Sequence, residues 1–127
     1  MPNRVLILDD DEDILSICTY ILEEMGCEVQ TRNNCNNIIQ MVQDIQPHVI
    51  LMDNWIPESG GIIATQTIKA HPELRHITII YFSANHDIKN LSQEAGADTY
   101  LEKPFDISQF EELINSVLPE QQNKRKP

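Results

Sequence analysis

The chain has 127 residues, which is enough for one domain with a single hydrophobic core. Hydrophobic residues make up 41% and charged residues 23% of the sequence, a balance typical of globular proteins that excludes a disordered acidic chain and a collagen. The formal net charge is −11, and three of the nine basic residues but only one of the 20 acidic residues follow Pro119, so residues 1–119 alone carry −13. A surface this acidic repels phosphates, so no direct nucleic-acid partner is expected.

The apolar runs and the cysteines of the sequence indicate in which cellular compartment the protein is found. The longest apolar runs, such as the four residues from Val5 to Leu8, are too short to cross a bilayer or to form the hydrophobic region of a secretory signal. The three cysteines are an odd number and include no C-x-x-C pair, so we expect free thiols and a reducing environment. The sequence therefore predicts a cytoplasmic protein that has no contact with a membrane.

Short apolar or β-branched runs alternate with segments of helical length along the chain. Strands are predicted over residues 4–8, 28–32, 48–52, 77–82 and 99–101. The run at 77–82 is continuously apolar apart from one threonine, which is typical of a central strand that is covered on both faces.

Each strand is followed by a segment with helical start or stop signals. The first helix is expected to end at Gly26, and the second to be capped by Asn33 or Asn34 and to end before Pro47. The other three are expected over 62–71, from 85 or 86 to 96, and from a cap at Asp106 to 118. The residues expected to face the sheet are Ile14, Ile17, Cys18, Ile21, Leu22 and Met25 in the first helix and Ile107, Phe110, Leu113, Ile114 and Val117 in the last.

Five strand–helix units in one domain predict an α/β fold, an open and doubly wound five-stranded parallel sheet with helices on both faces. A closed barrel would need about eight such units and about 250 residues. In an open parallel sheet the ligand site lies beyond the carboxyl ends of the strands, where the strand order reverses. The residues that follow each strand are therefore the candidates for the site.

Polar and charged side chains stand directly after the predicted strands. Asp9 and Asp10 follow the first strand, Asp53 the third, Ser83 the fourth and Lys103 comes just after the fifth. Carboxylates that converge within a few ångströms require a proton or a cation among them. Hard oxygen ligands at an open edge suit Mg²⁺, which is commonly bound by one or two carboxylates together with a phosphate.

These residues have the chemistry for phosphoryl transfer onto an aspartate. Asp53 is a carboxylate nucleophile, the metal would screen its charge, and Lys103 and Ser83 could each donate to an oxygen of the transferred group. The expected reaction is therefore the formation of an aspartyl phosphate on Asp53.

Residues 3–118 resemble a CheY-like receiver domain of bacterial two-component response regulators, a family with the flavodoxin-like fold. The matching segments are VLILDDDEDI, PHVILMDNWIP, IIYFSA and GADTYLEKPF. The resemblance implies that Asp53 is the phosphoacceptor, that Asp10 binds Mg²⁺ directly, that Asp9 acts mostly through water, and that the backbone carbonyl of Trp55 is a further metal ligand.

The resemblance also assigns the residues of a conformational switch. Ser83 matches the hydroxyl residue of the switch, Tyr100 its aromatic residue, and Lys103 the lysine that precedes a proline, with a cis Lys103–Pro104 peptide bond. The sequence departs from the commonest family pattern in having serine at Ser83 instead of threonine, and glycine at Gly60 where an acidic residue is common.

Trp55 is large for its place in the family pattern. The resemblance puts Trp55 and Asn85 on opposite rims of the phosphorylation pocket, where they could control the access of hydrolytic water. We hypothesise that they slow or alter dephosphorylation.

The resemblance implies a receiver over residues 1–119 with a short polar and basic tail over 120–127, in a chain that could be complete or a fragment. Its partners would be a histidine kinase or phosphotransfer protein and a downstream protein target. Such a domain is not an enzyme in the ordinary sense, because it catalyses only its own phosphorylation and dephosphorylation.

Two other functions are open at this point. A pseudo-receiver would use the same fold as an unphosphorylated interaction module, although none of the expected acidic, hydroxyl or lysine residues is missing. A Mg²⁺-dependent phosphatase with an aspartyl nucleophile would use Asp9 and Asp11, which have the spacing of the haloacid dehalogenase type, but this reading leaves Asp53 without a role.

Overall fold

A computed structural model describes residues 2–54 and 60–119. Its five strands form one parallel sheet in the order β2-β1-β3-β4-β5. The strands are β1 (Arg4–Leu8), β2 (Glu28–Arg32), β3 (Val49–Asp53), β4 (Thr78–Ser83) and β5 (Thr99–Glu102). The helices are α1 (Glu12–Glu24), α2 (Ile38–Ile45), α3 (Gly60–Ala70), α4 (Ile88–Ala95) and α5 (Ile107–Val117). The predicted α/β fold is confirmed, and the predicted strands are correct to within one residue at each end.

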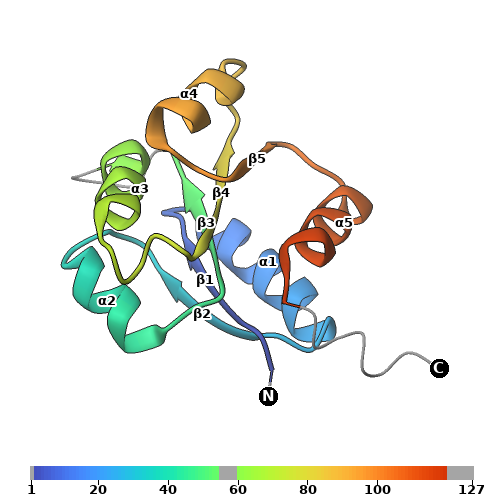
Figure 1. The fold of residues 1–127 in the computed structure, drawn as a ribbon. Helices are drawn as coiled ribbons and strands as arrows, with labels where there is room; N and C mark the ends of the chain where they lie inside the picture. The colour runs from blue at the N-terminus through green and yellow to red at the C-terminus, as the bar shows by residue number, and fades with distance from the viewer. Residues whose placement is uncertain (1, 55–59, 120–127) are drawn as a thin grey trace.

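Helices cover both faces of the sheet (Figure 1). Alternate residues of each central strand point to opposite faces, so β1 sends Val5 and Ile7 to one hydrophobic cluster and Leu6 and Leu8 to the other. The first cluster lies under α1 and α5, and the second under α2, α3 and α4. All five residues of β3 are buried, which explains its unbroken apolar sequence up to the terminal aspartate.

The starts of α2 and α4 differ from the prediction. The N-cap of α2 is Asn37 and not Asn33 or Asn34, because the Asn34 side chain accepts a hydrogen bond from the backbone N–H of Asn36 and forms a local turn. Asn85 makes the same kind of turn with Asp87, which is the residue that precedes α4. The cap of α5 is confirmed, since Asp106 forms a reciprocal capping box with Gln109.

Two isoleucines that were expected to face the sheet are exposed instead. Ile17 is 49% exposed because it lies about 90° around the helix from the centre of the buried face of α1, and Leu15 is buried in its place. Ile107 is 54% exposed because it is the first residue of α5, before the buried face that begins at Phe110. Cys18 is confirmed as a core residue, and burial raises the pKa of its thiol to about 12, so it stays protonated at neutral pH.

No helix within 2–54 and 60–119 is both long enough and apolar enough to span a bilayer. Trp55 and the tail at 120–127 lie outside the described residues.

Candidate functional site

The carboxyl edge of the sheet brings three carboxyl groups together. Leu8 of β1 pairs with Met52 of β3, so Asp9 and Asp53 come directly after paired positions on neighbouring strands. Asp9, Asp10 and Asp53 each offer a carboxylate oxygen, and these oxygens lie within 4.8 Å of one another. Asp9 is fully buried, Asp53 is 4% exposed and Asp10 is exposed. The strand order thus converts positions 44 residues apart in sequence into one acidic cluster, as we expected from the strand ends.

Lys103 supplies the positive charge of this cluster. Its Nζ donates to Asp9 Oδ2 at 2.8 Å and to Asp53 Oδ1 at 2.9 Å, and lies 4.7 Å from the centre of the Phe82 ring. Burial alone would lower the pKa of Lys103, but the hydrogen bonds to Asp53 and Asp9 outweigh it and raise the pKa above its ordinary value. Among the described residues, one ammonium group for three carboxyl groups leaves an excess of acid, which favours the binding of a cation.

The carboxylates of Asp9 and Asp10 differ in their access to solvent, because the oxygens of Asp9 are buried and hydrogen-bonded within the protein. Asp9 Oδ1 accepts the backbone N–H of Asp11 at 2.9 Å, and Asp9 Oδ2 accepts from Lys103. Asp11 in turn caps α1 through its side chain, which accepts from two backbone N–H groups of the first turn. Both oxygens of Asp9 are therefore held by the protein, whereas Asp10 faces solvent.

Ser83 and Tyr100, the two residues of the predicted switch, belong to the neighbouring strands β4 and β5. Ser83 is the last residue of β4, is 1% exposed, and its Oγ accepts the backbone N–H of Asn85 at 3.0 Å. The carbonyl of Ser83 accepts from the backbone N–H of Lys103 at 2.8 Å, which ties the end of β4 to the residue that follows β5. Tyr100 of β5 is 39% exposed, and Asn85 is also exposed. The Lys103–Pro104 peptide bond is cis, as the resemblance implied.

The first turn of α3 lies against the end of β3. The backbone N–H of Gly61 donates to the carbonyl of Asn54 at 3.3 Å, and a Cβ atom at Gly61 would lie only 2.2 Å from the carbonyl oxygen of Asp53. Only glycine fits there without displacing backbone. Gly61 lies just before the helix that the sequence predicts over residues 62–71, so this contact was not foreseen.

A second contact that the sequence does not predict joins β4 to Asn54, the residue after Asp53. The hydroxyl of Tyr81 donates to Oδ1 of Asn54. The sequence indicates that the Tyr81 hydroxyl needs a partner, but not which one. Tyr81 is the only residue with a polar group in the apolar run at 79–82, and a buried tyrosine hydroxyl normally has a hydrogen-bond partner.

The sequence matches the family model of the response regulator receiver domain over residues 5–115. The chain belongs to the response regulator receiver family. Receiver domains are signalling domains of two-component systems, and phosphoryl acceptance is their general function.

Individual relatives of this receiver domain agree with the assignment. The polar-differentiation response regulator DivK of Brucella anthropi is 33% identical over 122 residues, which cover 93% of this chain and 98% of the relative. A putative response regulator of Chloroflexus aurantiacus has a solved structure with a TM-score of 0.85 and 25% identity, and the match covers 92% of this chain and 98% of that one.

The receiver domain of the sensor histidine kinase PA1611 of Pseudomonas aeruginosa superposes with a TM-score of 0.83 at 25% identity, over 92% of this chain and 98% of that one. The structure of PA1611 has a magnesium ion coordinated in its active-site cleft.

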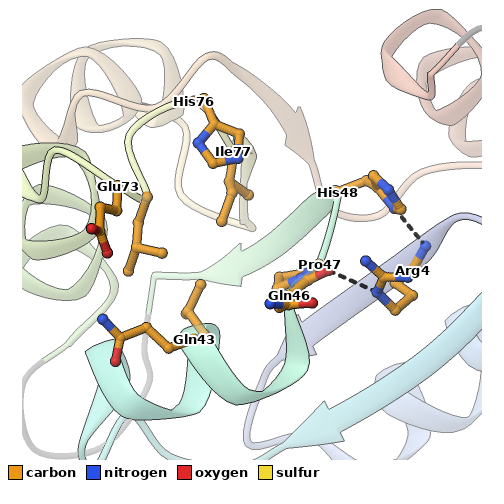
Figure 2. Close-up of a pocket in the computed structure, with 10 residues that line it drawn as sticks. Arg4, Gln43, Gln46, Pro47, His48, Glu73, His76 and Ile77 are labelled. Carbon is orange, nitrogen blue, oxygen red and sulfur yellow. Dashed lines mark hydrogen bonds between the residues drawn. The ribbon is translucent and has the colours of Figure 1, made fainter.

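A separate hollow of about 570 Å³ lies at the opposite edge of the sheet, by the amino ends of β1, β3 and β4 (Figure 2). Gln43, Glu73 and His76 line it, and the ring of His48 turns toward Arg4. His48 Nδ1 accepts the backbone N–H of Arg4 at 2.9 Å, and Arg4 Nε donates to the carbonyl of Gln46 at 2.8 Å. The length of the strands separates this hollow from the acidic cluster.

Proposed function

We propose that this receiver domain accepts a phosphoryl group on Asp53 in a magnesium-dependent reaction and thereby switches a protein-binding surface in a phosphorelay. The observation that supports the proposal most directly is the cluster at the carboxyl edge. There Lys103 donates hydrogen bonds to both Asp9 and Asp53, and Asp10 lies close by. The cluster combines a nucleophile for phosphorus, acidic ligands for a cation and a cationic donor for the transferred group.

The carboxylate oxygens of the cluster fit a magnesium ion. Mg²⁺ takes octahedral oxygen ligands at about 2.1 Å, so two ligands on opposite sides of the ion are about 4.2 Å apart. Oxygens within 4.8 Å of one another therefore need only small side-chain adjustments to bind it. Asp10 would be a direct ligand because it is exposed, and Asp9 would act through water because both of its oxygens accept hydrogen bonds from the protein.

The resemblance adds the backbone carbonyl of Trp55 to the metal ligands and makes Asp53 itself a ligand. A bound magnesium ion would offset the negative charge that develops on the transferred group.

The side chains of this domain have defined tasks in the transfer. A carboxylate oxygen of Asp53 attacks phosphorus and forms an O–P bond, while the P–N bond of a donor phosphohistidine breaks and the imidazole leaves with its electron pair. The ammonium group of Lys103 then donates to a phosphoryl oxygen, and the hydroxyl of Ser83 donates to another. The domain would catalyse only its own phosphorylation and dephosphorylation.

The phosphoryl group would change the protein-binding surface through Ser83 and Tyr100. The movement of Ser83 toward the new oxygens would let the half-exposed ring of Tyr100 turn inward. This would reshape the surface of α4, β5 and α5, which a downstream protein would recognise. The phosphoryl donor would be a histidine kinase or a phosphotransfer protein.

The decisive experiment is incubation of the full chain with acetyl phosphate, with and without Mg²⁺, followed by measurement of the intact mass. The wild-type protein should gain one phosphoryl group only when Mg²⁺ is present. Asp53→Asn should gain none, whereas the matched control Asp44→Asn, at an exposed position on α2, should gain one like the wild type.

A gain that persists in Asp53→Asn would contradict the assignment of the phosphoacceptor. A folded wild-type protein that binds Mg²⁺ but gains no phosphoryl group would contradict the proposed function and favour an unphosphorylated interaction module. Hydrolysis of a generic phosphoester, retained in Asp53→Asn and lost in Asp9→Asn, would favour the phosphatase.

A further inference from the structure

We propose that Tyr81 is a positioning residue for the phosphorylation of Asp53, because its hydroxyl holds the side chain of Asn54, the residue that directly follows the phosphoacceptor. This inference rests on the proposed function, since it assumes that Asp53 accepts the phosphoryl group.

Tyr81 is placed in the interior of the sheet. It lies in the middle of β4, is fully buried, and its hydroxyl donates to Oδ1 of Asn54. Burial first, and then the charge of Asp53, raise the pKa of Tyr81 to about 12, so the phenol keeps its proton and stays a donor at neutral pH.

Asn54 is held from three directions. Its backbone N–H donates to the carbonyl of Phe82 at 3.1 Å, its carbonyl accepts from Gly61 at 3.3 Å, and its side chain accepts from Tyr81. The peptide that follows Asp53 is thus fixed between β4 and the first turn of α3. A shift of this peptide would move the backbone of Asp53, and with it the carboxylate that must attack phosphorus in line with the leaving group.

The hydroxyl is not required for filling the core. A phenylalanine ring would occupy nearly the same volume at this position, and it would spare the protein the burial of a polar group. What phenylalanine cannot do is donate to Asn54. The role of Tyr81 therefore depends on the pair Tyr81–Asn54, and removal of either partner should have the same consequence.

The test uses the full chain and four variants, Tyr81→Phe, Asn54→Ala, the double variant and the control Tyr20→Phe, which removes a hydroxyl from an exposed tyrosine on α1. The measured quantity is the second-order rate constant of phosphorylation by acetyl phosphate at saturating Mg²⁺, under conditions where each protein is folded by circular dichroism. Each single variant should lower this constant by about fivefold or more, because misplacement of a nucleophile is costly.

The double variant should be no slower than the slower single variant, because the two residues act through one contact. Tyr20→Phe should stay within about twofold of the wild type, as expected for a surface substitution. A loss of folding stability alone would lower the unfolding midpoint without changing the rate constant of the folded protein.

Four results would overturn the inference. A Tyr81→Phe rate constant equal to that of the wild type would show that the hydroxyl positions nothing. An unchanged Asn54→Ala, or effects of the two substitutions that multiply in the double variant, would show that Tyr81 does not act through Asn54. If the wild type itself gains no phosphoryl group, both the proposed function and this inference are wrong. If the wild type is phosphorylated but the variants do not behave as expected, only the inference about Tyr81 is wrong.

Discussion

At the scale of single residues, one ammonium group stabilises two buried carboxylates from different strands. Lys103 lies 2.8 Å from Asp9 and 2.9 Å from Asp53, and both aspartates are almost fully buried. A buried ion pair contributes little over a well-packed apolar pair, but the removal of one partner leaves the other charge without compensation. The resting domain therefore depends on Lys103 even before any phosphoryl group arrives.

Lys103→Met should lower the free energy of unfolding by about 3 kcal/mol in the absence of Mg²⁺, because two buried carboxylates lose their cation. Urea denaturation at neutral pH measures this change. The control Lys89→Met, at an exposed position on α4, should change the free energy of unfolding by less than about 0.5 kcal/mol.

Magnesium should recover more stability in Lys103→Met than in the wild type, because the bound ion replaces part of the lost positive charge. Equal stabilisation of the two proteins by Mg²⁺ would contradict a shared site for the ion and the ammonium group.

At the scale of elements, α3 begins in direct contact with the end of β3. Gly61 is the second residue of α3, and it has no space for a side chain because the carbonyl of Asp53 fills the position where a Cβ atom would lie. The start of this helix is therefore tied to the backbone of the candidate phosphoacceptor.

Gly61→Ala should lower the free energy of unfolding by about 3 kcal/mol, since a backbone oxygen at 2.2 Å cannot rotate out of the way. It should also slow phosphorylation, because the relief of the clash displaces Asp53. Gly96→Ala is the control: it has a positive φ of 84° but open space around it, so it should cost only about 1 kcal/mol and leave the phosphorylation rate unchanged. Equal losses of stability in the two variants, measured by urea denaturation, would show that the close contact costs nothing.

The strands could be predicted from the sequence almost to the residue, because each central strand is an apolar run that is buried on both faces. The helix starts could not, since asparagine side chains cap helices and close short turns by the same hydrogen bond. Asn34 and Asn85 close turns here, and the helices begin three or four residues later. Ile17 was misplaced because apolar residues extend around α1 beyond its buried face.

The proximity of Asp9, Asp53 and Lys103 could be predicted because parallel topology brings strand ends to one edge. The pair Tyr81–Asn54 could not, because it depends on the register between β3 and β4, which the apolar pattern of either strand does not reveal. Gly61 was missed for a similar reason, since the close approach of α3 to β3 is a property of packing and leaves no mark on local sequence.

At the scale of the whole molecule, the two edges of the sheet differ in chemistry. The carboxyl edge holds the acidic cluster, and the amino edge holds His48 beside Arg4. Burial, and then the charge of Arg4, lower the pKa of His48 below 6.5, and its Nδ1 accepts a backbone hydrogen bond that protonation would remove.

Stability should fall as the pH drops below about 6.5, because the unfolded chain then binds a proton at His48 that the folded chain resists. The contribution is fully present above the unfolded pKa and is lost progressively toward the lower folded pKa. Between about pH 7.5 and pH 5.5, His48→Gln should lose less stability than the wild type in urea denaturation. His76→Gln, exposed in the same hollow, should follow the wild type, and parallel pH profiles for His48→Gln and the wild type would contradict the prediction.

The place of β4 in the strand order has a consequence for communication across the domain. Only β4 separates β3, which ends in Asp53, from β5, which carries Tyr100. Neighbouring strands are about 4.8 Å apart, so a structural change at the carboxyl end of β3 would have to extend only about 10 Å across the sheet to reach β5. If phosphorylation of Asp53 switches the surface as proposed, so short a path across the sheet would let the surface at β5 change while the hydrophobic core stays packed.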